Sequence, residues 1–83
     1  ALLEEGLITC ANILGPVESL FVWNGKQESA QEVGVLFKTT ADLIDRAVNR
    51  LGALHPYETP AIVANVCSAA HPDTLAWLEE QTR

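Results

Sequence analysis

Apolar and polar positions divide the chain into short segments with two periodicities. Several runs are rich in β-branched and aromatic residues, a composition that favours strands. Asn24-Gly25 is the strongest short signal for a hairpin, because both residues tolerate positive φ. Gly15-Pro16 is typical of a break between two strands. We therefore predict strands over four stretches of the chain: 7–14, 17–23, 33–37 and 61–67.

Two later segments have the periodicity of helices. Thr39 or Thr40 can cap a helix in which apolar residues recur at helical spacing over residues 43–54. Pro72 suits the first turn of a last helix, and Asp73 lies where the positive end of that helix favours an acid. The intervening segment 55–60 holds two prolines and is predicted to be a loop.

The first residues are typical of the end of a helix. Residues 1–5 include strong helix formers, and Gly6 suits the left-handed position after a helix C-terminus. With a strand placed before that helix, the order becomes βαββαβ plus a terminal helix, which is the ferredoxin-like α+β plan. We predict a single domain over residues 1–83 that is N-terminally incomplete, with the first strand absent from this chain.

The predicted hairpin carries apolar side chains on both faces. Alternation places Val17, Phe21 and Trp23 on one face and Leu20 and Val22 on the other. The returning strand does the same. An antiparallel sheet with one wet face alternates apolar and polar residues, and the helices of a two-layer domain cover only one face. We therefore expect a symmetric copy of the subunit to cover the second face.

Charge and cysteine content narrow the function. The net charge of −6, without a Lys/Arg cluster, argues against nucleic-acid binding. Cys10 and Cys67 have no zinc-site spacing, and we predict that both are small buried hydrophobes. No signal peptide or membrane span is recognisable in these residues, so we expect a cytoplasmic protein that does not act at a membrane. No catalytic motif is present, and we expect no enzyme activity.

Three stretches closely resemble the CutA family of divalent-cation tolerance proteins. They are Thr9-Cys10-Ala11-Asn12-Ile13, Trp23-Asn24-Gly25-Lys26 and His55-Pro56-Tyr57-Glu58-Thr59-Pro60. The resemblance implies a homotrimer of ferredoxin-like subunits that acts in tolerance of copper and other divalent metals by weak binding. Because the family trimer is similar to that of PII nitrogen-signalling proteins, one alternative is a signalling trimer that binds a small metabolite. Another is a structural trimer that docks a partner protein.

The resemblance implies that His55 is a metal ligand, and imidazole suits copper or zinc. The alternative is that its ring caps the preceding helix through an N–H bond to a free carbonyl. Leu54 stands where some relatives have a second histidine, Ala61 replaces a usual Glu, and Thr74 replaces a frequent Tyr. The family's proposed copper-binding cysteine lies in the absent strand, so Cys10 is a different cysteine.

The resemblance also implies a ligand cleft between subunits. The residues at the corresponding positions are Trp23, Lys26, Lys38, Tyr57 and Glu58. A hydroxyl, a carboxylate and ammonium groups that converge on an apolar cleft can bind a small anion or metabolite. The structural alternative is that Trp23 packs at the interface, Lys38 pairs with Glu58, and Tyr57 holds the proline loop.

Overall fold

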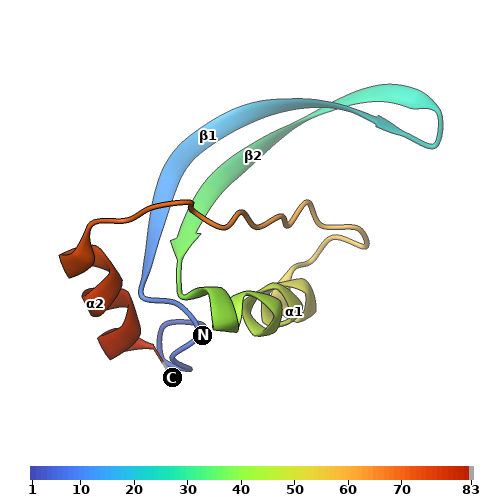
Figure 1. The fold of residues 1–83 in the computed structure, drawn as a ribbon. Coiled ribbons are helices and arrows are strands. Elements are labelled where there is room, and N and C mark those ends of the chain that lie inside the picture. The colour runs from blue at the N-terminus through green and yellow to red at the C-terminus, as the bar shows by residue number, and fades with distance from the viewer. Residues whose placement is uncertain (83) are drawn as a thin grey trace.

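The computed structural model describes residues 1–82, in which a long antiparallel hairpin extends over two helices (Figure 1). The helices lie on one side of the hairpin, so the fold class is α+β with a sheet layer and a helix layer, as predicted. The elements in chain order are β1 (Cys10–Trp23), β2 (Lys26–Lys38), the 3₁₀ turn η1 (Ala41–Leu43), α1 (Ile44–Leu54) and α2 (Pro72–Gln81).

The predicted hairpin turn is confirmed. Asn24 and Gly25 have φ angles of 52° and 77°, and Trp23 pairs directly with Lys26 across the turn. The returning strand is longer than predicted, because β2 already begins at Lys26 within the polar stretch. Backbone pairing at a tight turn extends a strand even where the side chains are polar and exposed.

The predicted break at Gly15-Pro16 is wrong, because β1 continues through it. The register shifts between Ile13 and Gly15, so that Leu14 is the extra residue of a β-bulge. Gly15 has a φ of 96°, a conformation that glycine adopts without steric cost. The Gly15-Pro16 pair therefore marks a bulge within one continuous strand and not a break between two strands.

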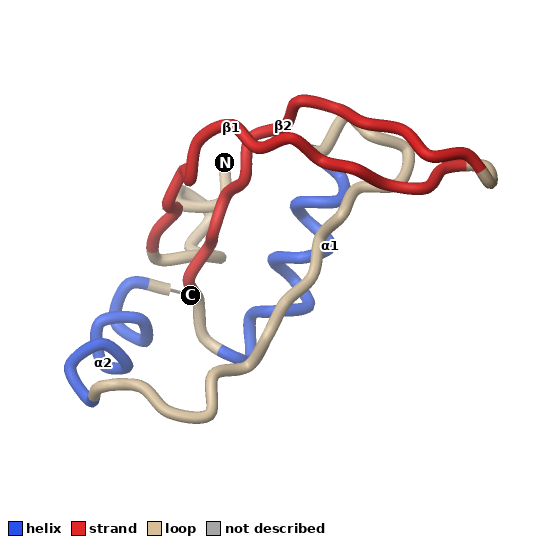
Figure 2. Tube along the Cα trace, turned by 90° about the horizontal axis from the view of Figure 1, so that it is seen from above, coloured by secondary structure: helices blue, strands red, loops and turns tan. Residues whose placement is uncertain are grey.

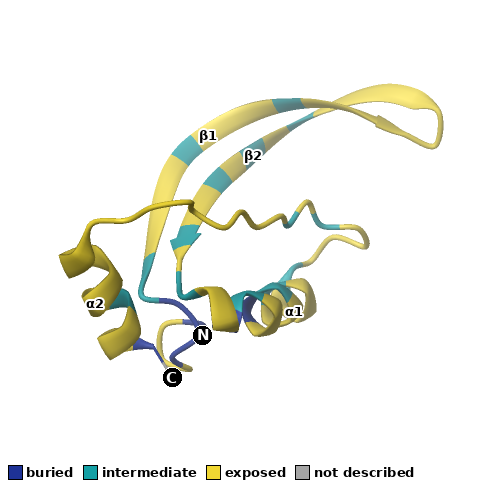
Figure 3. Cartoon of the chain, viewed as in Figure 1, coloured by how far each residue is buried: buried dark blue, intermediate teal, exposed yellow. Residues whose placement is uncertain are grey.

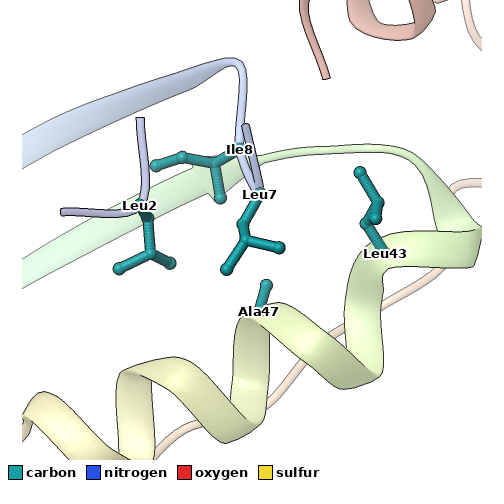
Figure 4. Packing of buried hydrophobic residues seen from close by; sticks show 5 residues of the cluster. All are labelled: Leu2, Leu7, Ile8, Leu43 and Ala47. Atoms are coloured by element: carbon teal, nitrogen blue, oxygen red, sulfur yellow. The ribbon is translucent and has the colours of Figure 1, made fainter. Parts of the chain in front are cut away.

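The hydrophobic core lies where the start of the chain meets α1. Leu2, Leu7, Ile8, Leu43 and Ala47 form one buried cluster, in which Leu7 points towards Ala47 (Figure 4). Phe37 at the end of β2 and Leu51 of α1 are partly buried against this cluster. The cluster thus holds together the first residues, the base of the hairpin and the beginning of α1.

The predicted helix end at Gly6 is confirmed as a complete C-terminal motif. Gly6 has a φ of 72°. The N–H of Leu7 donates to the carbonyl of Leu2 at 3.1 Å, and the N–H of Gly6 donates to that of Leu3 at 3.2 Å. These two bonds, together with the packing of Leu2 and Leu7 in one cluster, make a Schellman motif.

The two helices begin differently. Thr40 precedes η1 without a side-chain cap, and the hydroxyl of Thr39 donates instead to the carbonyl of Leu7 at 2.7 Å. Thr40 therefore occupies the predicted N-cap position but makes no side-chain cap, while Thr39 ties the end of β2 to the core. The predicted start of α2 is confirmed, with Pro72 and Asp73 in its first turn.

The predicted strand over residues 61–67 is wrong. The segment forms no strand, and Val63 and Val66 are 87% and 74% exposed. Cys67 is exposed and Cys10 is half-buried, so neither is the buried hydrophobe that we predicted. A strand is defined by its hydrogen-bonded neighbours, and within residues 1–82 the sheet has only β1 and β2.

The hairpin exposes apolar side chains on both faces, as the alternation predicted. Most of its surface is exposed, and the outer half extends beyond the helices (Figure 3). The large apolar residues exposed on one face are Val17, Phe21, Trp23 and Leu36, and those on the other are Ile13, Leu20, Val22, Val33 and Val35; Leu14 is also exposed, at the bulge.

Candidate functional site

The candidate metal residue His55 lies at the junction of α1 and the proline loop. Its backbone N–H donates to the carbonyl of Leu51 at 2.9 Å and so ends the helix. Its ring faces the loop: Nδ1 accepts the backbone N–H of Tyr57 at 3.1 Å. The two rings meet edge to face, with centroids 4.6 Å apart. The backbone of His55 caps the helix, whereas its ring holds the first turn of the loop.

The hydrogen bond at Nδ1 determines what the ring can bind. In a neutral imidazole one nitrogen accepts and the other carries the proton, so Nε2 of His55 is a donor in this arrangement. A histidine that binds a metal through Nε2 normally donates from its Nδ1. A metal at His55 therefore requires the opposite tautomer and the loss of the bond to Tyr57.

Tyr57 interacts with a residue that sequence analysis did not single out. Hydrogen bonding to the Glu32 carboxylate, and then the negative charge of that carboxylate, raise the pKa of Tyr57 above its usual value. Glu32 is a half-buried residue of β2, and this interaction joins the proline loop to the hairpin. Nothing near Glu32 in the sequence marks it, because its partner is remote along the chain.

The five candidate cleft residues do not come together within one chain. Trp23 and Lys26 flank the hairpin turn, whereas Lys38 pairs with Cys10 at the opposite end of the two strands. At 3.3–3.4 Å per residue, the hairpin separates these ends by about 40 Å. Only Tyr57 and Glu58 share a loop.

Within the described residues of one chain, Lys38 and Glu58 form no ion pair. Within residues 1–82 the ion pairs join the N-terminal amine to Glu4, Arg50 to Glu5, and His71 to Asp73 when the imidazole is protonated. The structural alternative also has Tyr57 holding the proline loop, and this agrees with the contacts of Tyr57 to His55 and Glu32.

One chain offers few groups for a cation. Within the described residues no three His, Cys, Asp or Glu side chains are grouped so that they could hold a metal ion. His71 is engaged in the same way as His55: its Nδ1 accepts the N–H of Asp73 at 3.1 Å and caps α2. Within the described residues, His55 thus belongs to no group of three such side chains.

Comparison with known proteins agrees with these features. The profile of the CutA1 divalent ion tolerance protein family matches residues 1–81. The chain belongs to the CutA1 family. The divalent-cation tolerance protein CutA of Pyrococcus horikoshii is 42% identical over 82 residues, which are 99% of this chain and 79% of that protein.

Solved CutA structures share the fold. The divalent cation tolerance protein of Thermus thermophilus has a TM-score of 0.92 at 38% identity, over 99% of this chain and 80% of that one. A PII-like CutA from Nostoc has a TM-score of 0.90 at 31% identity, over 99% and 80% of the two chains. The family predicted from the sequence motifs is thus confirmed. The strands and helices of this chain are arranged as in the solved relatives.

Proposed function

We propose that this protein is a cytoplasmic homotrimer that supports tolerance of divalent metal ions, copper above all, by binding them weakly rather than by catalysis. The observation that carries the proposal is the position of His55, at the start of the loop that bears the family motif, in a chain whose relatives are named divalent-cation tolerance proteins.

Assembly follows from the hairpin. Ten large apolar residues of the hairpin are exposed, and the helices lie on one side only. Monomeric proteins rarely expose contiguous apolar surface of this kind, so a copy of the subunit is the simplest cover. In a closed trimer the turn of one subunit can meet the proline loop of the next. Trp23 and Lys26 can then complete a cleft with Tyr57 and Glu58, which one chain alone keeps apart.

Weak binding follows from the state of His55. A cation that takes Nε2 removes the proton there, so that Nδ1 must give up the N–H of Tyr57. Losing this hydrogen bond makes the free energy of metal binding less favourable by about 1 kcal/mol. The remaining ligands come from a neighbouring subunit and are held less firmly than those of a site built within one chain.

Calorimetric titration with copper tests the metal site. We expect weak binding that His55→Ala reduces, whereas the matched variant His71→Ala leaves it unchanged, because His71 has the same kind of Nδ1 hydrogen bond but lies outside the loop that bears the family motif. Equal effects of the two substitutions, or no effect of either, would remove His55 from the site. Native mass spectrometry tests the assembly, and a monomer at micromolar concentration would contradict the trimer.

The second candidate is a PII-like trimer that binds a small metabolite in its clefts. It is favoured by the similarity to the Nostoc protein, whose structure is described as PII-like. A phenol, a carboxylate and the ammonium group of Lys26 are the polar groups such a cleft would offer. Thermal-shift screening with nucleotides and small organic acids tests it: a Tm rise that Tyr57→Phe or Lys26→Ala diminishes supports this candidate over the first.

A further inference from the structure

We propose that Asn24 is a site of spontaneous deamidation, and that the closed hairpin turn confines this reaction to the moments when the turn opens. The product is an aspartyl or isoaspartyl residue in the turn between β1 and β2. The inference is independent of the proposed metal site, because it rests on the chemistry of two neighbouring residues in one chain.

Asn24 differs from the other asparagines in the residue that follows it. Asn12, Asn49 and Asn65 precede isoleucine, arginine and valine. The side chain of such a residue crowds its backbone nitrogen and hinders attack by that nitrogen on the asparagine. Asn24 precedes Gly25, which has no side chain, and apart from the chain neighbours nothing lies within 4 Å of the place where a Cβ would be. The nitrogen of Gly25 is therefore sterically free to attack.

The turn is also open to solvent. Residues 21–29, which comprise the turn and the strand ends next to it, are all exposed. Figure 1 shows the turn at the free end of the hairpin, beyond both helices. Seen from above, the turn again lies at the end of the two strands, away from α1 and α2 (Figure 2). Water and hydroxide thus have access to both residues of the turn.

The reaction consumes water and releases ammonia. The backbone nitrogen of Gly25 gives its proton to hydroxide and attacks Cγ of Asn24. The new bond closes a succinimide ring, and the bond from Cγ to the side-chain nitrogen breaks, so that this nitrogen leaves as ammonia with a proton from water. Water then opens the ring. Attack at Cγ gives aspartate, whereas attack at the main-chain carbonyl carbon gives isoaspartate, which adds a methylene group to the main chain.

The closed turn opposes ring closure. The φ angles of Asn24 and Gly25, 52° and 77°, are those of a type I′ turn, in which ψ of the first central residue is about +30°. At this ψ the next backbone nitrogen lies on the opposite side of the Cα–C bond from Cβ, and it cannot reach Cγ. The attack requires a rotation about ψ that ends the direct pairing of Trp23 with Lys26. Deamidation in the folded chain therefore needs local opening of the hairpin end.

The product alters the turn in charge and in length. Either form places a carboxylate between Trp23 and Lys26, two of the candidate cleft residues. Isoaspartate also lengthens the main chain, so that a two-residue turn no longer fits the register in which these two residues pair. Deamidation at Asn24 thus changes the end of the hairpin without any change in the encoded sequence.

Incubation at mildly alkaline pH, followed by peptide mapping, tests the site in the folded chain and in the same chain unfolded by guanidinium chloride. We expect conversion of Asn24 in both states, slower in the folded chain by about tenfold or more. Asn65, which is exposed as well, should convert more slowly than Asn24 in the unfolded chain. Equal rates for Asn24 in the two states would overturn the protection by the turn. Absence of conversion in the folded chain, or faster conversion at Asn65, would overturn the site.

Two tryptophan variants test whether opening of the turn controls the rate. Trp23 and Trp77 are 41% and 42% exposed, but only Trp23 pairs across the turn. Trp23→Ala weakens this pair, and we expect conversion of Asn24 in the folded chain to become about two- to fivefold faster, with no change in guanidinium chloride. Trp77→Ala in α2 should leave both rates unchanged. An unchanged rate in folded Trp23→Ala, or equal acceleration by both variants, would contradict the proposal.

Discussion

The chain has a closed region and an open region, and the contrast between them bears on function. In the closed region, the first residues pack on η1 and the start of α1, with Ile8 only 2% exposed. In the open region, comprising the outer hairpin and residues 61–67, no hydrophobic residue is fully buried. The two regions nonetheless have similarly apolar sequences.

This difference shows that burial depends on neighbours more than on hydrophobicity. Leu2, Leu7 and Ile8 are buried because α1 lies against them, and a Schellman motif sets the direction of the chain. The open region has comparable residues and no second layer. Apolar surface of this kind is where association with other chains contributes free energy, so the contacts between subunits that we propose involve the open region.

The largest expected effect comes from the closed region. Leu2 is buried and Leu3, its neighbour in the same turn, is 55% exposed. We expect Leu2→Ala to lower the free energy of unfolding by about 3 kcal/mol, because it leaves a cavity in a small cluster. The matched variant Leu3→Ala should cost less than about 0.5 kcal/mol. Urea denaturation measures both, and equal losses would show that the two leucines are covered alike in solution.

Local signals in the sequence were sufficient for much of the fold. The Asn24-Gly25 turn, the end of a helix at Gly6 and the start of α2 at Pro72 each depend on residues close together in the chain. The strand over residues 61–67 could not be predicted correctly in this way, because a strand requires a neighbour that composition does not supply. The bulge at Gly15 likewise depends on its pairing with β2.

The candidate site was less predictable than the fold. His55 and Tyr57 are found from their motif, but the bond between Nδ1 and a backbone N–H depends on the ring orientation. Glu32 was missed because it belongs to a different element from Tyr57. The separation of Trp23 from Lys38 could have been foreseen, since a hairpin that turns at Asn24 places its middle and its end far apart.

A smaller effect concerns the glycine that closes the first turn. Gly6→Ala should lower the free energy of unfolding by about 1 kcal/mol, because its φ of 72° crowds a Cβ. Gly52 is the matched control: it is helical and has open space around it, so Gly52→Ala should raise stability by about 0.5–1 kcal/mol. Thermal unfolding of both variants checks the opposite signs. A loss at both positions would contradict the open surroundings of α1.

The smallest expected effect lies where the proline loop meets the hairpin, at the contact of Tyr57 with Glu32 of β2. Because the carboxylate favours the protonated phenol, the pKa of Tyr57 is raised in the folded chain. The interaction therefore stabilises the fold fully below the unfolded value near 10 and is lost as the pH rises through the folded value. Phenolate absorbance should show that Glu32→Gln lowers the pKa of Tyr57, while Glu58→Gln, on the same loop as Tyr57, leaves it unchanged. A titration that Glu32→Gln does not move would mean that the proline loop is not held to β2 in solution, and the open region would then be looser than we describe.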